Sequence, residues 1–278
     1  MTTLFKHFGI GPEHRLGGGG EADVYALGAE RVVRVMKAPA DIASEDRRRA
    51  LLERLSKPAE ALSFAIPQVL DFGIVGAKIF TVERRIDGIA MDLALGHDMP
   101  HRAELVTNYM QAALDLGRIH GAGFFGELGG ADPLTAADQT SALASIAARS
   151  LASAGLTFDP TPCAAALPQP TRPGLAHIDY FPGNVMCDGA TITGVLDFGY
   201  STIAADARLT AIIAGACLHS RLAANANDGD RKVADGWLAE RGLAQYLAPT
   251  NVWLAAFWAF AYPDDPALEV WGKKQLGL

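Results

Sequence analysis

The chain is poor in cysteine and has no long apolar run. Its three cysteines, Cys163, Cys187 and Cys217, are odd in number and lack the close spacing of a zinc site. The first residues, MTTLFKHFGIGPEHRL, contain no apolar signal-peptide region. The longest apolar stretches, LTAIIAGACL and VWLAAFWAFAY, are far shorter than the roughly 20 residues that span a bilayer. These absences predict a cytoplasmic protein with reduced thiols and no membrane segment.

Basic residues are not in excess either. The formal net charge is −7 at pH 7, whereas nucleic acid favours a clustered basic surface, so we expect no nucleic-acid partner. Residues 1–90 are close to neutral, and residues 91–278 carry the negative charge. An acceptor site in this second part would favour a cation. A solvated acidic surface that only aids solubility explains the charge equally well.

What is present is the composition of a folded protein. Hydrophobic residues make up 50% of the 278 positions and charged residues 20%, as in globular proteins that bury a sizeable core. In the first 90 residues, EADVYAL and RVVRVMK flank the short turn GAE and predict a hairpin. A helix is expected over IASEDRRRALLERL, with Pro58 stopping it, and two more strands follow in IPQVLDFGIVGAKIFTVERRI. Five strands and one helix would make a small α+β lobe.

The rest of the chain is predicted to be mainly helical. ELVTNYMQAALDLGRIH has its apolar residues on one helical face, and prolines keep the end of an Ala-rich and Pro-rich region, about 130–173, irregular. Strand-like segments return at GLAHIDYF, NVMCDG and TITGVLDFG, before helices resume from about Ala205. The natural division is an N-terminal lobe, residues 1–87, and a C-terminal lobe, residues 88–278.

A glycine-rich turn and a cation follow one another in the first lobe. LGGGGEADVYAL has the spacing Gly-x-Gly-x-x-Ala-x-Val from Gly17 and Gly19, which fits a glycine loop over phosphates except that Ala22 replaces a third glycine. Four successive glycines also make a flexible hairpin. On the next strand, Arg34 and Lys37 compete as the phosphate-binding cation. Arg34 is preferred because it ends the β-branched run.

The stretch HIDYFPGNVMCDGATITGVLDFG places acidic and amide side chains between apolar runs. Asp179 and Asn184 lie five positions apart on a loop, and Asp197 follows at the end of a strand. Carboxylate and amide oxygens suit Mg²⁺, which is held by few protein groups together with phosphate oxygens. A further carboxylate can orient an acceptor hydroxyl and take its proton. Turn capping accounts for any one of these residues but not for the set, because unpaired buried carboxylates are costly.

These residues carry a resemblance to the aminoglycoside phosphotransferase and choline kinase-like group, relatives of the protein kinases. The chain resembles its signature in the motif H-x-D-x-x-x-x-N from His177 and in D-F-G from Asp197, and the likeness extends to AIPQVLDFG, to LGRIH ending at His120 and to the glycine loop. It covers about residues 15–210. The resemblance implies a two-lobed protein-kinase-like fold of the α+β class, with a small β-rich N-terminal lobe and a larger, mainly helical C-terminal lobe.

The resemblance also implies roles for individual residues. Asp179 would be the catalytic carboxylate, His177 would brace the catalytic loop, and Asn184 and Asp197 would bind Mg²⁺. The residues implied for the ATP or GTP donor are Gly17 and Gly19 over the phosphates, Arg34 in contact with them, Glu45 as the partner of Arg34, and the backbone of Val82, Glu83 and Arg84 at the adenine.

Three positions depart from the family pattern. Ile178 stands where glycine is usual, and Arg34 replaces the commoner lysine with a planar fork instead of a point charge. Helical spacing puts Arg48 where the acidic partner of that cation is expected. Glu45 lies one turn earlier and Glu53 over a turn later, and we name Glu45.

Other polar and aromatic residues near the C-terminus have structural explanations. Asp206 is interpreted as structural, capping the helix that follows it, and Thr210 stands where the family often has a later Asp. All four tryptophans are near the C-terminus, where core packing explains them better than an aromatic wall for a cationic acceptor. Candidates for ammonium recognition on the same footing are Asp228, Asp230, Asp235, Asp264 and Asp265.

The sequence therefore favours an aminoglycoside phosphotransferase-like enzyme, with antibiotic resistance as its role and a small-molecule hydroxyl acceptor. A metabolite kinase acting on choline, a sugar or an amino alcohol is the first alternative, since family likeness does not fix the substrate. A nucleotide-binding pseudokinase is the second, suggested by Arg34, Ile178 and the ambiguous Glu. The sequence does not indicate an oligomeric state.

Overall fold

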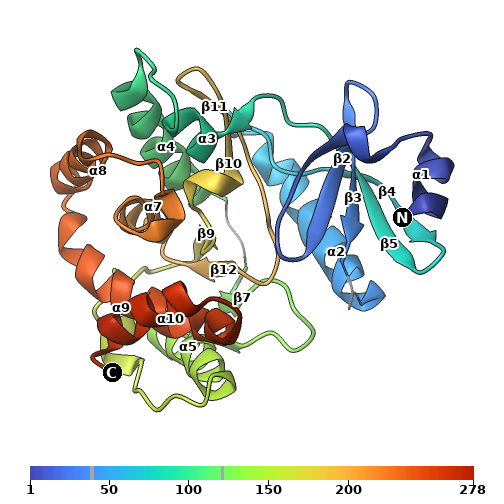
Figure 1. Cartoon of the computed structure of the whole chain (residues 1–278). Coiled ribbons are helices and arrows are strands. Elements are labelled where there is room, and N and C mark those ends of the chain that lie inside the picture. Colours follow the sequence, from blue (N-terminus) through green and yellow to red (C-terminus); the bar gives the residue numbers. More distant parts are fainter. Residues whose placement is uncertain (38–40, 120–121) are drawn as a thin grey trace.

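The computed structural model describes residues 1–37, 41–119 and 122–278 and shows two lobes (Figure 1). His120, which ends the LGRIH stretch, lies outside the described residues. The first lobe contains a five-stranded antiparallel sheet in the order β1-β2-β3-β5-β4. Its strands are β1 (Arg15–Gly18), β2 (Ala22–Ala26), β3 (Arg31–Met36), β4 (Val69–Val75) and β5 (Lys78–Arg84). The five strands expected from the sequence are thus present.

The two faces of this sheet pack against different helices. Side chains alternate along a strand, so Val33 and Val35 of β3 enter a cluster with Leu4 of helix α1 (Thr2–Phe8), which the sequence pattern did not predict. Arg34 points to the opposite face, where it meets helix α2 (Ile42–Ala59). The apolar residues near the C-terminal end of α2, such as Leu52, pack into the core of the second lobe.

Helix α2 is longer than expected. Its N-cap is Asp41, whose side chain accepts the backbone N–H of Ala43 at 3.1 Å. Pro58 lies inside the last turn, and the helix ends at Ala59, so the expectation that Pro58 stops the helix was wrong. Proline lacks an N–H, and within the final turn this removes only one intrahelical hydrogen bond.

The second lobe is mostly helical and has two small sheets. A three-stranded sheet has the order β11-β10-β6, and a four-stranded sheet has the order β8-β7-β12-β9. Their strands are β6 (Ile89–Ala90), β7 (Phe125–Glu127), β8 (Thr135–Ala136), β9 (Gly174–His177), β10 (Val185–Asp188), β11 (Thr191–Val195) and β12 (Thr202–Ala205). The helices are α3 (Met91–Leu95), α4 (Arg102–Leu116), α5 (Gln139–Ser153), α6 (Thr161–Ala165), α7 (Leu209–Leu218), α8 (Asp228–Glu240), α9 (Leu247–Phe257) and α10 (Pro266–Leu276). Short 3₁₀ helices are η1 (Pro12–His14), η2 (Pro182–Asn184), η3 (Arg221–Ala223), η4 (Ala244–Tyr246) and η5 (Trp258–Asp264).

Strand β12 is a correction to the sequence analysis, which resumed helices from about Ala205. The strand occupies 202–205 and pairs antiparallel with both β7 and β9. Helix α7 begins only at Leu209. Because β12 is fully buried between two strands, its apolar run was indistinguishable from the start of a buried helix.

A backbone junction ties the first lobe to the second. The N–H of Ala65 donates to the carbonyl of Thr193 at 2.9 Å, and the N–H of Val195 donates to the carbonyl of Ala65 at 3.0 Å. Strand β11 is therefore held on both sides, by β10 and by this segment of the first lobe. This arrangement carries the chain from β11 directly to the interface between the lobes, where Asp197 lies.

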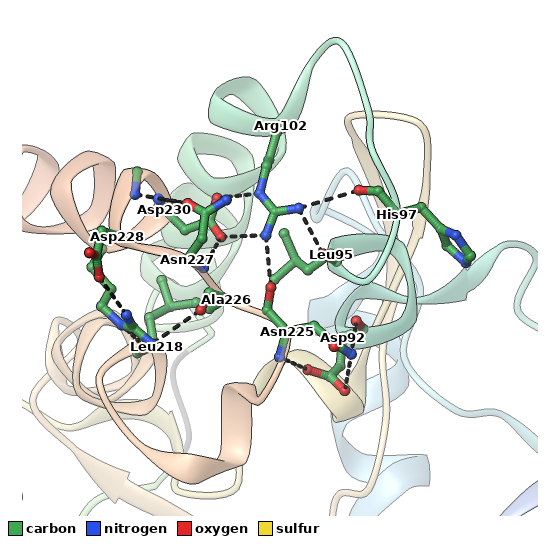
Figure 2. A network of polar contacts seen from close by, with 12 residues as sticks. Asp92, Leu95, His97, Arg102, Leu218, Asn225, Ala226, Asn227, Asp228 and Asp230 are labelled. Atoms are coloured by element: carbon green, nitrogen blue, oxygen red, sulfur yellow. Dashed lines mark hydrogen bonds and ion pairs between the residues drawn. The ribbon is translucent and has the colours of Figure 1, made fainter.

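The arginine at the start of α4 clamps the far end of the second lobe together (Figure 2). The guanidinium of Arg102 contacts both carboxylate oxygens of Asp230 at 2.7 Å, and it also donates to the carbonyls of Leu95 and Asn225 at 2.7 and 2.8 Å. These contacts join α3 and α4 to the N-terminus of α8. Asn225 in turn hydrogen-bonds to Asp92 of α3.

Among the helices in the described ranges, none is long and apolar enough to cross a membrane.

Candidate active site

Asp179, the expected catalytic carboxylate, lies on the loop that follows the buried strand β9. Its side chain is half-buried, and its Oδ1 accepts the indole N–H of Trp258 at 3.1 Å. Burial raises the pKa of Asp179 above its usual range. The charge of Asp197 adds to this, whereas His177 and hydrogen bonds from Trp258 and Ser201 oppose it. The carboxylate is thus held in a confined position next to a second acidic residue.

His177 ties the loop of Asp179 to the chain before Asp197. The ring is fully buried, and Nε2 lies 2.8 Å from the carbonyl of Leu196, so Nε2 is the nitrogen that donates. Burial lowers the pKa of His177, although the hydrogen bond to Leu196 opposes the shift. The backbone N–H of His177 donates to Oγ1 of Thr210 at 3.0 Å. Both contacts agree with the bracing role that the resemblance implies.

Asn184 and Asp197 offer oxygen atoms at the same place. The Nδ2 of Asn184 donates to the backbone carbonyl of Asp179 at 3.0 Å, which leaves its Oδ1 free to coordinate a cation. The carbonyl of Asn184 accepts the N–H of Leu196 at 2.8 Å and brings Asn184 next to Asp197. This pair suits Mg²⁺, which needs one or two protein oxygens in addition to phosphate oxygens. Within the described ranges, no group of three His, Cys, Asp or Glu side chains forms a self-contained metal site.

The backbone of Asp197 is strained. Its φ is 63°, the one positive φ at a residue other than glycine in the described chain. Such a conformation costs on the order of 1 kcal/mol or more and persists where surrounding structure enforces it, often at functional sites. It turns the carboxylate away from β11, and the side chain is 49% exposed and 4.0 Å from Arg34.

Arg34 and Glu45 form the ion pair that the sequence left ambiguous. Nη1 of Arg34 lies 3.4 Å from both carboxylate oxygens of Glu45, and all these groups are buried. Arg48, the rival position on α2, instead binds Glu83 of β5 at 2.7 Å. Nη1 of Arg48 also lies 4.0 Å from Oε2 of Glu45. Sequence spacing pointed to Arg48 because both residues lie on the inner face of α2, and only the position of β3 selects Glu45.

The glycine loop lies over the edge of this ion-pair network. A Cβ added at Gly17, Gly19 or Gly20 would meet no protein atom within 4 Å, and none of these glycines has a positive φ. Neither packing among the described residues nor backbone conformation therefore requires glycine at these three positions. Gly18 differs, because a Cβ there would lie 2.8 Å from the carbonyl oxygen of Ala22. Nζ of Lys37 donates to the carbonyl of Gly19 at 2.5 Å. Lys37 thus supports the loop, whereas Arg34 points toward Asp197.

The expected adenine contact at Val82, Glu83 and Arg84 conflicts with the sheet. These residues end β5, which pairs with β3 on one side and with β4 on the other. The N–H of Arg84 donates to the carbonyl of Gln68, and the N–H of Arg85 donates to that of Glu30. A central strand uses its backbone groups on its neighbours, so the sheet already occupies part of the backbone that this contact would need, and the adenine contact stays a prediction. The side chain of Glu83 is equally occupied, because Arg48 and Thr81 both donate to it and the charge of Arg48 lowers its pKa against the cost of burial.

Ile178, Asp206 and Trp253 have structural surroundings in the second lobe. Ile178 is fully buried in the core of the second lobe. The carboxylate of Asp206 accepts the backbone N–H and the guanidinium of Arg208, so its interpretation as a structural residue agrees with the geometry. Trp253 lies in the core, as packing predicts. Three candidates for ammonium recognition are paired with arginines, namely Asp228 with Arg231, Asp230 with Arg102 and Asp265 with Arg221. A fourth, Asp235, lies 2.8 Å from Nε2 of His219.

Three aromatic residues at this site were not predicted. Trp258 contacts Asp179, and the half-exposed rings of Tyr200 and Phe260 meet edge to face with their centroids 5.5 Å apart. Burial raises the pKa of Tyr200, and the charges of Asp179, Glu21 and Asp197 add to this shift. Tyr200 directly follows the D-F-G motif, and that position was the available signal. Nothing in the local sequence distinguishes Trp258 from the core tryptophans.

Comparison with known proteins agrees with this geometry. The model of the phosphotransferase enzyme family matches residues 13–206. A search of curated proteins found no match. Solved structures of similar fold include a GDP complex of an aminoglycoside 2′-phosphotransferase-IIIa variant, with TM-score 0.63, 13% identity, and coverage of 99% of this chain and 94% of that one. Another is the streptomycin–ATP ternary complex of the aminoglycoside phosphotransferase APH(2″)-IIa, with TM-score 0.57, 15% identity, and coverage of 98% and 93%. A third is the aminoglycoside 3′-phosphotransferase of type VIII, with TM-score 0.57, 17% identity, and coverage of 87% and 91%.

The fold and the motifs define a two-lobed, kinase-like α+β protein, as the sequence predicted. The chain belongs to the phosphotransferase enzyme family, in the aminoglycoside phosphotransferase and choline kinase-like group. It is therefore a kinase-type transferase whose relatives in structure bind ADP, ATP or GDP.

Proposed function

We propose that the chain is a Mg²⁺-dependent O-phosphotransferase that moves the γ-phosphoryl of ATP or GTP to a hydroxyl of a small molecule. The observation that carries the proposal is the meeting of Asp179, Asn184, Asp197 and Arg34 at the junction of the lobes. Asp197 is 4.0 Å from Arg34, and Asn184 and His177 are both hydrogen-bonded to the backbone of Leu196, the residue before Asp197. The lobes would be residues 1–87 and 88–278, with the donor between them.

The residues of this chain account for the steps that the transfer needs. Asp179 accepts a hydrogen bond from the acceptor hydroxyl and orients it for in-line attack on the γ-phosphorus. As the new P–O bond forms, Asp179 takes the hydroxyl proton, the bond between the γ-phosphorus and the oxygen that bridges it to the β-phosphorus breaks, and ADP or GDP leaves. Arg34, held by Glu45, binds the donor phosphates, and the open glycine loop leaves room above them. Mg²⁺ bound by Asn184 and Asp197 would neutralise charge on the phosphates. Catalysis is then mainly positioning and electrostatics.

The base of the nucleotide requires a new position. Because the backbone of Val82, Glu83 and Arg84 serves the sheet, we place the base against the link that follows Arg85, before β6. A hydrogen bond joins this link to the β10–β11 hairpin, because Oγ1 of Thr193 donates to the carbonyl of Asp87 at 2.5 Å.

Two classes of acceptor are supported by different observations. An aminoglycoside is supported by the similar solved structures, which include complexes with gentamicin, kanamycin and streptomycin, and by the acidic second lobe. A metabolite kinase for choline or an amino alcohol is supported by the partly exposed, mutually contacting rings of Tyr200 and Phe260, since a cation with an apolar surface can lie against such rings. In either case the acceptor is small and cationic, and resistance to an antibiotic would follow only from the first.

The test is nucleotide consumption with Mg²⁺ across aminoglycosides, choline, sugars and amino alcohols. Wild type is compared with Asp179→Ala and with Asp188→Ala, a control that removes an exposed carboxylate from β10. We expect turnover with one class of acceptor, its loss in Asp179→Ala with nucleotide binding retained, and normal turnover in the control. Full turnover by Asp179→Ala would refute the role of Asp179. Thermal stabilisation by ATP that is indifferent to Mg²⁺ would favour a pseudokinase instead.

A further inference from the structure

The indole of Trp258 is delivered to Asp179 from a distant part of the chain. The two residues are 79 positions apart, and their contact joins Nε1 of the indole to Oδ1 of the carboxylate at 3.1 Å. Trp258 is the first residue of η5, between α9 and α10, and it is buried. An indole nitrogen is a donor only, so this group can hold the carboxylate without competing for its proton.

The segment that carries Trp258 is itself held in place. Oγ of Ser150, on α5, donates to the carbonyl of Phe257 at 2.6 Å and accepts the N–H of Phe260 at 2.8 Å. These two bonds fix the backbone on both sides of Trp258. On the other face, the ring lies 6.0 Å from that of Trp271 of α10, measured between centroids. Two helices therefore determine where the indole N–H points.

A carboxylate that orients a hydroxyl needs such a fixed partner. The last torsion angle of an Asp side chain has a broad minimum, so the backbone alone does not determine where its oxygens lie. The amide of Asn184 does not supply the restraint, because its Nδ2 donates to the backbone carbonyl of Asp179 and not to the side chain. The bond from Trp258 holds Oδ1, which leaves the rest of the carboxylate to the acceptor and to the nearby hydroxyl of Ser201.

We propose that Trp258 is a positioning residue for phosphoryl transfer, whose indole N–H fixes Asp179 so that one carboxylate oxygen is presented to the acceptor hydroxyl. This inference rests on the proposed function, in which Asp179 is the catalytic carboxylate. It gives the C-terminal helices a part in catalysis, in addition to their part in the core.

The chain contains a matched control for the loss of one indole N–H. Trp253, on α9, is fully buried and donates its Nε1 to the carbonyl of Leu143 at 3.0 Å, away from Asp179. Trp258→Phe and Trp253→Phe therefore make the same chemical change in the same hydrophobic core cluster. Both variants should lose stability, but only the first loses the contact with the carboxylate.

The first experiment uses the four indole N–H resonances in a ¹⁵N–¹H spectrum of the whole chain, assigned from single Trp→Phe variants. We expect Asp179→Asn to shift the resonance of Trp258 and to leave that of Trp253 unchanged. An unmoved Trp258 resonance would overturn the inference. This measurement needs neither donor nor acceptor, so it is independent of the proposed function.

The second experiment is steady-state kinetics with Mg²⁺·ATP and the best acceptor of the panel above, or with water as acceptor if no panel member reacts. Misplacement of a reacting group by about 1 Å can lower the rate of the chemical step on the order of 100-fold. Trp258→Phe should therefore lower kcat about 10-fold to 100-fold, while the KM for ATP stays within about twofold of the wild-type value. Trp253→Phe should keep kcat within about twofold. In an Asp179→Asn background, Trp258→Phe should cause no further loss, because the two residues act as a unit.

The outcomes separate the two hypotheses. If Asp179→Asn keeps full turnover, the proposed function fails, and the inference fails with it. If Asp179→Asn is inactive but Trp258→Phe behaves like Trp253→Phe, only the role of Trp258 is refuted. An equal loss of kcat in both tryptophan variants would show that Trp258 acts through packing alone.

Discussion

Replacement of Arg102 by methionine is the sharpest test of how the second lobe is held together. In the clamp of Figure 2, the side chain of Asp230 is 2% exposed and that of Arg102 is 20% exposed. The guanidinium makes two bonds to this carboxylate and further bonds to the carbonyls of Leu95 and Asn225. Methionine retains most of the stem but donates nothing, so Asp230 would keep only the backbone N–H of Asn227 at 2.7 Å.

The size of the effect follows from burial. Removal of one partner from a buried ion pair costs about 3–5 kcal/mol, because a charge is left without compensation. An exposed pair is worth about 1 kcal/mol or less. Arg118, which is 75% exposed and lies 3.2 Å from Asp115, therefore provides the matched control. Arg118→Met should change the free energy of unfolding by less than about 1 kcal/mol.

Urea denaturation followed by far-ultraviolet circular dichroism measures both variants. We expect Arg102→Met to lower the free energy of unfolding by about 3–5 kcal/mol. The double variant Arg102→Met/Asp230→Leu should recover much of this loss, because it removes the stranded charge. A loss of less than about 1 kcal/mol in Arg102→Met, comparable with an exposed pair, would refute the reasoning from burial.

Three further predictions concern the site. Asp197→Gly should raise the free energy of unfolding by about 1 kcal/mol, since glycine adopts a φ of 63° without strain. The same variant should no longer be stabilised by Mg²⁺·ATP. Thermal denaturation with and without Mg²⁺·ATP measures both effects, and an unchanged stability of the free protein contradicts the strain argument. Burial raises the folded-state pKa of Asp179 above its ordinary value of 3.8. Between these two pKa values the native protein keeps a proton that the unfolded chain has lost. The stability of the wild type therefore falls as the pH rises from 3.8 through the folded-state pKa. Asp179→Asn should therefore be the more stable protein at neutral pH, with an advantage that shrinks as the pH falls toward 3.8; equal differences across the pH series would count against this explanation. Arg34→Met should weaken the binding of Mg²⁺·ATP at least about 10-fold, and Lys37→Met should weaken it much less. A fluorescence titration measures both affinities. A larger loss of affinity in Lys37→Met would assign the phosphate contact to Lys37.

Local patterns in the sequence predicted much of the first lobe correctly. The hairpin of β2 and β3 followed from β-branched alternation around GAE, and the register of the two strands pairs Val24 with Arg34 as a short turn requires. The same reasoning failed for β12, because a short apolar run buried on both sides has no periodicity that separates strand from helix. It failed for Pro58 because proline near a helix end costs little.

The candidate site was predictable to the extent that one stretch of sequence contains it. His177, Asp179, Asn184 and Asp197 lie within 21 consecutive residues, and the hairpin between them brings the two ends together through Leu196. The pairing of β5 with a strand on each side, which occupies backbone groups expected at the adenine, cannot be seen in the strand itself. Trp258 was missed because a tryptophan among apolar residues looks the same whether its indole meets a core carbonyl or a carboxylate.

The sequence by itself determined the strands of the first lobe, the family signature and the order of the residues that carry the chemistry, because these depend on near neighbours in the chain. Only the tertiary structure decided which charges pair. Glu45 rather than Arg48 meets Arg34 because α2 crosses β3 at that turn, and Arg102 meets Asp230 across 128 positions. Such contacts arise when helices and strands pack to bury their apolar faces, and packing depends on the whole chain and not on any one stretch of it.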